Sequence, residues 1–184
     1  NDAGNQIEKF KTSLEAPYLQ LFRPSVQMPE DAYLGEDIID HAKQFAAIHR
    51  DAYVHTDSET RRQGLCDYAR PLDIQTLHDD LAKYRITYDC WFKESSLHQS
   101  GAVAEMIEKL KASGHTYEKD GALWFKSTDF GEDKDRVLVR ANGVVTYFVP
   151  DIAYHYNKLV TRGYDLAIDV LGADHHGYVP RMKG

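Results

Sequence analysis

Much of the chain carries the hydrophobic spacing of amphipathic helices. Apolar residues recur three and four positions apart in four stretches: 7–22, 36–50, 71–84 and 100–113. This spacing puts the apolar side chains on one face of a helix, so each stretch is predicted to be helical. Pro71 suits the first turn of the third helix, and Ser100 can cap the fourth. Residues 51–70 are polar and charged, and a helix there would have an unclear packing face.

Extended segments are predicted between and after these helices. Residues 86–92 concentrate aromatic and β-branched side chains, which favours a strand. Two hairpins are predicted at Asp120-Gly121 and Asn142-Gly143, because both dipeptides tolerate the positive φ angles of tight turns. The run 166–171 predicts a further strand, in which Asp169 interrupts an otherwise apolar sequence.

The last section returns to an α/β pattern. Residues 147–149 are expected to end a strand, Pro150 to open a helix that stops at Gly163, and residues 176–183 to enter another helix after the strand 166–171. The predicted class is therefore an α/β fold that carries an inserted α+β lobe with β-hairpins. Ligands bind beyond the carboxyl ends of strands in open α/β sheets, so a ligand site is expected near residues 147–151 and 172–177.

Composition limits the classes of protein. The chain has 184 residues, 42% of them hydrophobic, and no apolar run long enough to span a bilayer, so a soluble protein without membrane association is expected. It begins with Asn1 and ends where a helix is expected to start, which suggests a fragment. Cys66 and Cys90 are far apart, as expected for free thiols in a reducing compartment. A net charge of -7 gives no global attraction for nucleic acid.

Asp151 is the strongest candidate for binding chemistry. A carboxylate in a cleft can pair bidentately with a guanidinium or another cation, and the Tyr147 hydroxyl lies one helical turn away as a hydrogen-bonding partner. The alternative is that Asp151 only stabilises the positive end of its helix. The spacing of the two residues does not choose between these interpretations.

The triplet Asp174-His175-His176 has two interpretations. Its side chains are common ligands of zinc or iron, but adjacent residues rarely turn toward one ion and no spaced ligand completes the set. Nucleotide contact fits better, because Gly172 permits close backbone approach and a carboxylate accepts bonds from ribose hydroxyls. No Walker-type or Gly-x-Ser-x-Gly signature occurs. The basic residues are interpreted as solvated surface: Lys126, Lys134, Arg136, Arg140, Arg162, Arg181 and Lys183.

Several long segments together carry a resemblance to a known family. They are NDAGNQI, MPEDAYLGEDIID, YEKDGALWFKSTDFGEDKDRVLVRANGVVTYFVPDIAYHYNK and GADHHGYVPRMK. In these segments the chain closely resembles bacterial arginyl-tRNA synthetase, a class I aminoacyl-tRNA synthetase. The resemblance covers nearly the whole chain and is most specific from Tyr117 to Lys183.

The resemblance implies a Rossmann-type catalytic domain that activates L-arginine with ATP as arginyl-adenylate and transfers it to tRNA(Arg). It implies that residues 1–184 are part of that domain, with an inserted lobe at about 86–149 and a helix-strand-helix of the nucleotide-binding core at 150–184. For the full enzyme it implies Mg²⁺, a cytoplasmic location and a monomer. It assigns Tyr147, Asp151 and His175 to arginine, and Gly172, Asp174 and His176 to ATP.

The catalytic motifs of the family are expected outside this chain. The HIGH-type motif should precede Asn1 and the KMSKS-type loop should follow Gly184, so the isolated chain is expected to lack adenylation activity. Two alternatives remain open: a non-catalytic module that binds arginine or a nucleotide, and a metal-dependent hydrolase centred on Asp174, His175 and His176.

Overall fold

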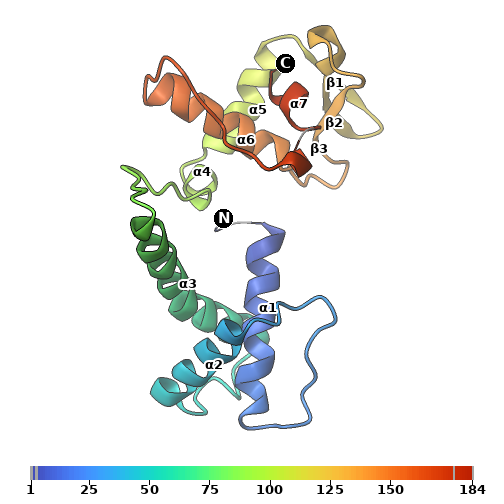
Figure 1. Ribbon diagram of the computed structural model, residues 1–184. Coiled ribbons are helices and arrows are strands. Elements are labelled where there is room, and N and C mark those ends of the chain that lie inside the picture. Colours follow the sequence, from blue (N-terminus) through green and yellow to red (C-terminus); the bar gives the residue numbers. More distant parts are fainter. Residues whose placement is uncertain (1, 3, 176, 184) are drawn as a thin grey trace. The chain divides into compact units, whose positions relative to one another are not determined.

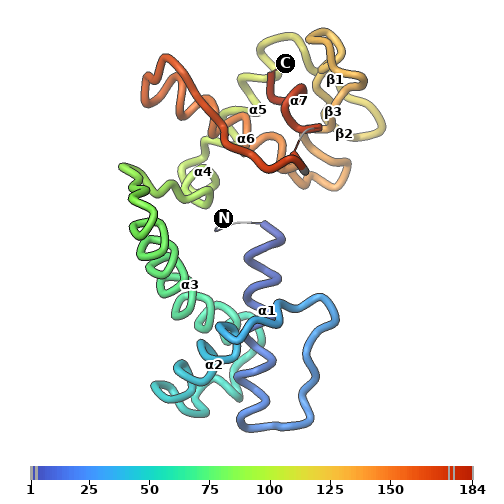
Figure 2. The backbone as a smooth tube through the Cα atoms, in the orientation of Figure 1, coloured from blue at the N-terminus to red at the C-terminus, as the bar shows by residue number. Residues whose placement is uncertain are grey.

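The structure is a computed structural model that describes the chain except for residues 1, 3, 176 and 184 and the side chain of Asp174. It divides into two compact units, residues 1–92 and 93–184, which are described separately. The first unit is helical, with α1 (Asn5–Gln20), α2 (Glu36–His49) and α3 (Ser58–Lys83) (Figure 1). A long connection over residues 21–35 joins α1 to α2 (Figure 2).

The core of the first unit forms where the three helices pack together. Tyr18 is fully buried, and its hydroxyl donates to the Arg50 carbonyl over 2.8 Å and accepts from the Tyr53 backbone N–H over 3.2 Å. A buried phenol needs such partners, because an unmade hydrogen bond in the core is costly. The core cluster consists of Leu14, Tyr18, Ile38, Ala42, Phe45, Val54, Leu65 and Ala69.

Helix α3 corrects the prediction of a helix that begins at Pro71. It begins at Ser58, runs through the polar stretch and continues past Pro71, which removes only one helical N–H. The Asp57 carboxylate caps the helix by accepting from the Thr60 N–H over 2.9 Å. Leu65 and Cys66 supply the buried face that the polar composition concealed.

The strand predicted over residues 86–92 is wrong, because this segment is irregular. A strand requires a hydrogen-bonding neighbour, and the described residues of this unit contain no strand. The aromatic residues pack against each other instead. Trp91 stacks on His78 with ring centroids 3.7 Å apart, and Tyr88 meets Trp91 edge to face at 5.6 Å.

The second unit combines short helices with a small sheet. Its helices are α4 (Ser95–Gln99), α5 (Ala102–Ala112), α6 (Phe148–Tyr156) and α7 (Val179–Lys183), with a 3-10 turn η1 (Ser127–Phe130), a π-helical turn η2 (Asn157–Thr161) and a 3-10 turn η3 (Ala173–His175). Its strands are β1 (Thr116–Lys119), β2 (Ala122–Phe125) and β3 (Arg136–Val139), antiparallel in the order β1-β2-β3. The helix predicted over 100–113 is thus α5, preceded by Gly101 rather than capped by Ser100.

The first predicted hairpin is confirmed, and the second is confirmed only as a turn. Asp120 and Gly121 have φ angles of 52° and 73°, and Lys119 pairs with Ala122 across the turn. After Asn142-Gly143, a single bridge joins Val139 to Val145.

Residues 147–149 therefore do not end a strand, because Tyr147 directly precedes α6, which begins at Phe148 rather than at Pro150. The Thr146 backbone N–H and hydroxyl donate to the carbonyls of Leu138 (2.9 Å) and Val137 (2.8 Å). These bonds hold the chain against β3, and the buried Phe148 and Val149 then start α6. The predicted end at Gly163 agrees with its φ of 69°, beyond the π-helical turn.

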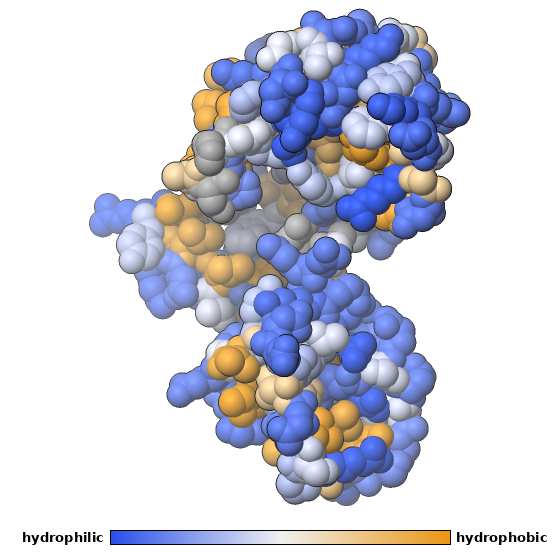
Figure 3. All heavy atoms as spheres, turned by 90° about the vertical axis from the view of Figure 1, so that its right-hand side faces the viewer, coloured by the Kyte–Doolittle hydropathy of each residue, from blue (hydrophilic) through white to orange (hydrophobic). Residues whose placement is uncertain are grey.

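The strand predicted over residues 166–171 is also wrong, because the segment is irregular and largely exposed. No parallel partner strand occurs in the described ranges. The mixed α/β class is confirmed in the coarse sense of helices with a small antiparallel sheet. Most of the surface visible in Figure 3 is hydrophilic, and none of the helices over the described residues is long and apolar enough to cross a membrane.

Candidate functional site

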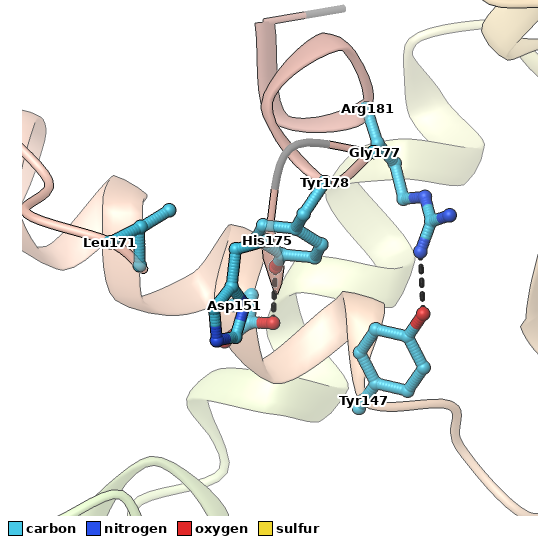
Figure 4. A pocket seen from close by; sticks show the side chains of 7 residues that line it. All are labelled: Tyr147, Asp151, Leu171, His175, Gly177, Tyr178 and Arg181. Atoms are coloured by element: carbon cyan, nitrogen blue, oxygen red, sulfur yellow. Dashed lines mark hydrogen bonds between the residues drawn. The ribbon is translucent and has the colours of Figure 1, made fainter. Parts of the chain in front are cut away.

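A hollow of about 660 Å³ lies in the second unit between the start of α6 and the segment 171–181 (Figure 4). It is lined by Tyr147, Asp151, Leu171, His175, Gly177, Tyr178 and Arg181. The hollow therefore contains three of the predicted site residues, namely Tyr147, Asp151 and His175.

Helix α6 places Tyr147 and Asp151 on the same side of the hollow. Tyr147 is the residue before the first helical residue, and the Asp151 N–H donates to the Tyr147 carbonyl over 3.4 Å. Four residues make about one helical turn, so the two side chains project in similar directions. Tyr147 is 63% exposed. Tyr147 and Asp151 therefore both line the hollow.

The Asp151 carboxylate accepts a hydrogen bond from the Tyr178 hydroxyl (Figure 4). Burial raises the pKa of Tyr178 well above its ordinary value, and the neighbouring Asp151 carboxylate raises it further. Tyr178 is therefore a protonated donor at any physiological pH. Tyr178 was not identifiable from the sequence, because its contact with Asp151 joins residues 27 positions apart. The sequence alone does not show that the chain brings two such distant residues together.

Arg181 hydrogen-bonds to the Tyr147 hydroxyl, the second polar group expected to contact a ligand in the hollow. Its Nη1 donates to the Tyr147 hydroxyl, and its Cζ lies 6.0 Å from the Tyr147 ring centre and 5.7 Å from that of Tyr178. The Arg181 Nε is buried and has no acceptor among the described atoms. Arg181 therefore lines the site, which corrects its interpretation as solvated surface. The available signal was its position four residues after Gly177 in the segment GADHHGYVPR.

The predicted nucleotide-binding residues are described only in part. Gly172 accepts at its carbonyl from the His175 N–H over 3.0 Å, and the His175 carbonyl accepts from the Tyr178 N–H over 2.8 Å. These bonds form the turn that brings His175 and Tyr178 toward Asp151 (Figure 4). Gly172 is not one of the lining residues. His176 and the Asp174 side chain lie outside the described part of the structure.

The side chains of the hollow suit the binding of a planar cation. A carboxylate and a phenol oxygen can accept several N–H bonds from a guanidinium, and aromatic rings favour its flat face. Over the side chains that the structure describes, no group of three or more His, Cys, Asp and Glu could hold a metal ion. The site therefore offers recognition chemistry for a nitrogen-rich cation.

The chain matches known proteins along its whole length, although no family model matches it. It is 59% identical over 184 residues to the arginine–tRNA ligase of Caldanaerobacter subterraneus subsp. tengcongensis and 55% identical over 185 residues to that of Ruminiclostridium cellulolyticum. Each match covers 100% of this chain and 33% of the relative. A solved structure of an arginyl-tRNA synthetase from Campylobacter jejuni matches with a TM-score of 0.86 and 35% identity, covering 99% of this chain and 39% of that one.

The chain thus corresponds to a segment of aminoacyl-tRNA ligases. More narrowly, the relatives are arginine–tRNA ligases, and the chain spans about a third of their length. The resemblance seen in the sequence is therefore confirmed.

Proposed function

We propose that this chain is the amino-acid-recognition part of an enzyme that activates L-arginine with ATP and transfers the arginyl group to tRNA(Arg). The observation that carries the proposal is the 59% identity to an arginine–tRNA ligase over the entire chain. The hollow supports it independently, because Tyr147 and Asp151 suit a guanidinium.

The reaction proceeds in two steps. A carboxylate oxygen of arginine attacks the α-phosphorus of ATP, and the bond to pyrophosphate breaks to give arginyl-adenylate. A terminal ribose hydroxyl of the tRNA then attacks the arginyl carbonyl, and AMP leaves with the bonding electrons. The hollow contributes positioning of the amino acid, which accelerates a reaction of this kind by fixing the reactants close together.

In the bound state the arginine guanidinium donates to the Asp151 carboxylate and to the Tyr147 hydroxyl. It must then replace the Tyr178 hydroxyl on Asp151 and the Arg181 guanidinium on Tyr147. A lysine ammonium is a compact point charge and cannot reproduce the fork of a guanidinium, so arginine is preferred. His175 lies beside Asp151 and completes the amino-acid side of the site.

The ATP assignments follow from the family resemblance. Gly172, Asp174 and His176 follow the irregular segment 166–171, and a Rossmann-type catalytic domain in the whole protein is part of the same proposal. Mg²⁺ accompanies the phosphates of ATP, a common arrangement for this ion, and the described residues supply no cluster of three or more ligands for it. A cytoplasmic, monomeric enzyme is part of the same proposal.

Asp151→Asn tests the proposal in the whole protein that carries this chain. Loss of the carboxylate removes the charge-assisted bonds to the guanidinium, so arginine affinity and arginine-dependent pyrophosphate exchange into ATP should each fall about 100-fold. Isothermal calorimetry and the exchange assay measure the two effects. Asp165→Asn makes the same charge change at an exposed position of the same unit and should leave both unchanged.

Three other outcomes would argue against the proposal. Undiminished arginine binding by the Asp151→Asn protein would remove the assigned role of Asp151. Arginine binding without any exchange activity in the unaltered protein would favour a binding module. Activity that requires zinc and no arginine would favour a hydrolase.

A further inference from the structure

The segment 164–171 leads from α6 to the hollow with little apolar packing of its own. Three of its apolar side chains, Leu166, Ile168 and Val170, are 72%, 76% and 94% exposed, and Tyr164 and Leu171 are 54% and 47% exposed. Hydrophobic burial therefore contributes little to holding this segment in place. Polar contacts must supply a larger share of its positioning.

Asp169 makes these polar contacts, with two residues of the helical stretch that begins at α6. Its Oδ2 lies 2.6 Å from the His155 Nε2, and its Oδ1 accepts from the Lys158 Nζ over 2.7 Å. Lys158 also lies 4.9 Å from the centre of the Tyr154 ring. The bond from Lys158 lowers the pKa of Asp169 below its usual value despite partial burial, and His155 lowers it further.

His155 connects the same contact to the candidate site. Its Nδ1 lies 2.8 Å from the Asp151 backbone carbonyl, one helical turn before it. One imidazole ring thus touches the Asp151 backbone with one nitrogen and the Asp169 carboxylate with the other. The His155 and Lys158 side chains are largely buried, which strengthens such contacts relative to fully exposed ion pairs.

The contact lies immediately before the residues that form the far wall of the hollow. Leu171 is two positions after Asp169, and His175 follows in the next turn. Fixing Asp169 against the helix therefore limits how far these wall residues can move from Asp151. A displacement of about 1 Å at a binding site can change rates by about 100-fold.

We propose that Asp169, His155 and Lys158 form a clasp that positions the arginine site. The clasp holds the segment 164–171 against the helix and thereby keeps Leu171 and His175, which line the hollow, near Asp151. The three residues are positioning residues, since none of them lines the hollow. This inference rests on the proposed function in one respect, the identity of the ligand.

Asp169→Ala in the whole protein opens the clasp, because it removes both contacts at once. Asp165→Ala in the same segment is the matched control, since it removes an exposed carboxylate without a described side-chain contact. Arginine Kd, measured by calorimetry, should rise about fivefold in Asp169→Ala and stay within about 1.5-fold in the control. Asp169→Asn keeps one oxygen acceptor and should give an intermediate Kd.

Hydrogen exchange supplies a readout that needs no ligand. Backbone amides of residues 170–178 should exchange faster in Asp169→Ala, while those of β1 and β2 keep their rates. A double-mutant cycle of Asp169→Ala with His155→Ala should be non-additive, because both changes remove the His155–Asp169 contact.

The outcomes separate the clasp from the proposed function. Equal arginine Kd values for Asp169→Ala and Asp165→Ala would overturn the positioning role. If the unaltered protein fails to bind arginine, the proposed function falls, and exchange over residues 170–178 then decides the clasp alone. Faster exchange there in Asp169→Ala supports the clasp, and unchanged exchange overturns it.

Discussion

The recognition atoms of the hollow are already engaged before a ligand binds. The Tyr178 hydroxyl is hydrogen-bonded to the Asp151 carboxylate, and the Arg181 guanidinium is hydrogen-bonded to the Tyr147 hydroxyl. A guanidinium ligand therefore exchanges protein hydrogen bonds for its own, and only the difference contributes to affinity. The resident donors weaken binding, and they also avoid leaving a carboxylate without a partner in a partly enclosed site.

Tyr178→Phe should consequently strengthen arginine binding. The substitution removes the competing hydroxyl and keeps the ring, so we expect the arginine Kd to fall about three- to fivefold. Calorimetry on the whole protein measures the change. Tyr164→Phe is the control, since Tyr164 is exposed and outside the hollow. A weaker Kd in Tyr178→Phe would mean that the Tyr178 hydroxyl contacts the ligand rather than competing with it.

Residue-level prediction from sequence succeeded for local pairs. Tyr147 and Asp151 were identifiable because a helix fixes the direction of side chains four residues apart. Tyr178 and Arg181 were not identifiable as their partners, because contacts over 27 and 34 residues depend on how the chain returns to α6. The assigned roles remain predictions for both groups of residues, namely Tyr147, Asp151 and His175 for arginine and Gly172, Asp174 and His176 for ATP.

At the level of elements, α1 and α3 are joined by a buried ionic network. Glu15 accepts from Arg61 over 2.9 Å, from Arg62 over 2.6 Å and from Ser58 over 2.6 Å. Arg61 also donates to the carbonyls of Tyr53 and Thr56. The network explains why the polar residues 58–62 form a helix with a packed face.

Glu15→Gln should destabilise the first unit. In this variant the buried Arg61 guanidinium would lose the carboxylate that balances its charge. The free energy of unfolding should therefore fall by about 2 kcal/mol at pH 7. Urea unfolding measures the loss. Glu30→Gln, at an exposed position of the connection between α1 and α2, should change stability by less than about 0.5 kcal/mol.

The same network predicts a dependence on pH. Burial raises the pKa of Glu15, but the hydrogen bonds from Ser58, Arg62 and Arg61 outweigh it, so the pKa is lowered overall. Folding then favours the carboxylate, and its contribution is present above the ordinary glutamate pKa of about 4.3. That contribution is lost as pH falls through the lowered value. The stability difference between the unaltered protein and Glu15→Gln should therefore shrink below about pH 4; a constant difference would contradict this.

Elements were predictable where local chemistry decides them. The Asp120-Gly121 hairpin follows from turn geometry, and α2 follows from its hydrophobic spacing. Pro71 gave a misleading signal, because the tertiary contacts of α3 outweigh the loss of one hydrogen bond. The segments 86–92 and 166–171 have strand-like composition, but a strand needs a neighbour, and composition does not supply one.

At the scale of the whole molecule, the ionic network and the hollow lie in different units. The Glu15 network lies within residues 1–92, and the hollow lies within residues 93–184.

The coarse α/β class was predictable from the alternation of helical and hairpin signals. A parallel sheet is assembled from non-local pairings, so the Rossmann-type arrangement came from the family resemblance and not from the pattern.

The division predicts that changes in the two units act independently. Glu15→Gln should leave the arginine Kd of the folded protein within about twofold, since sites without shared partners usually contribute additively. Calorimetry at a temperature where the variant is fully folded checks this. A much larger loss of affinity would show that the ionic network of the first unit is coupled to the hollow.

The exposed row of Leu166, Ile168 and Val170 also affects how the protein behaves in solution. Apolar side chains at every second position favour cross-β pairing between identical chains, which is a route to aggregation. Asp169 puts a negative charge inside this row, and charges at such positions act as gatekeepers against self-association. The carboxylate that closes the clasp is therefore also a charge that counters aggregation of this segment when the chain is produced at high concentration.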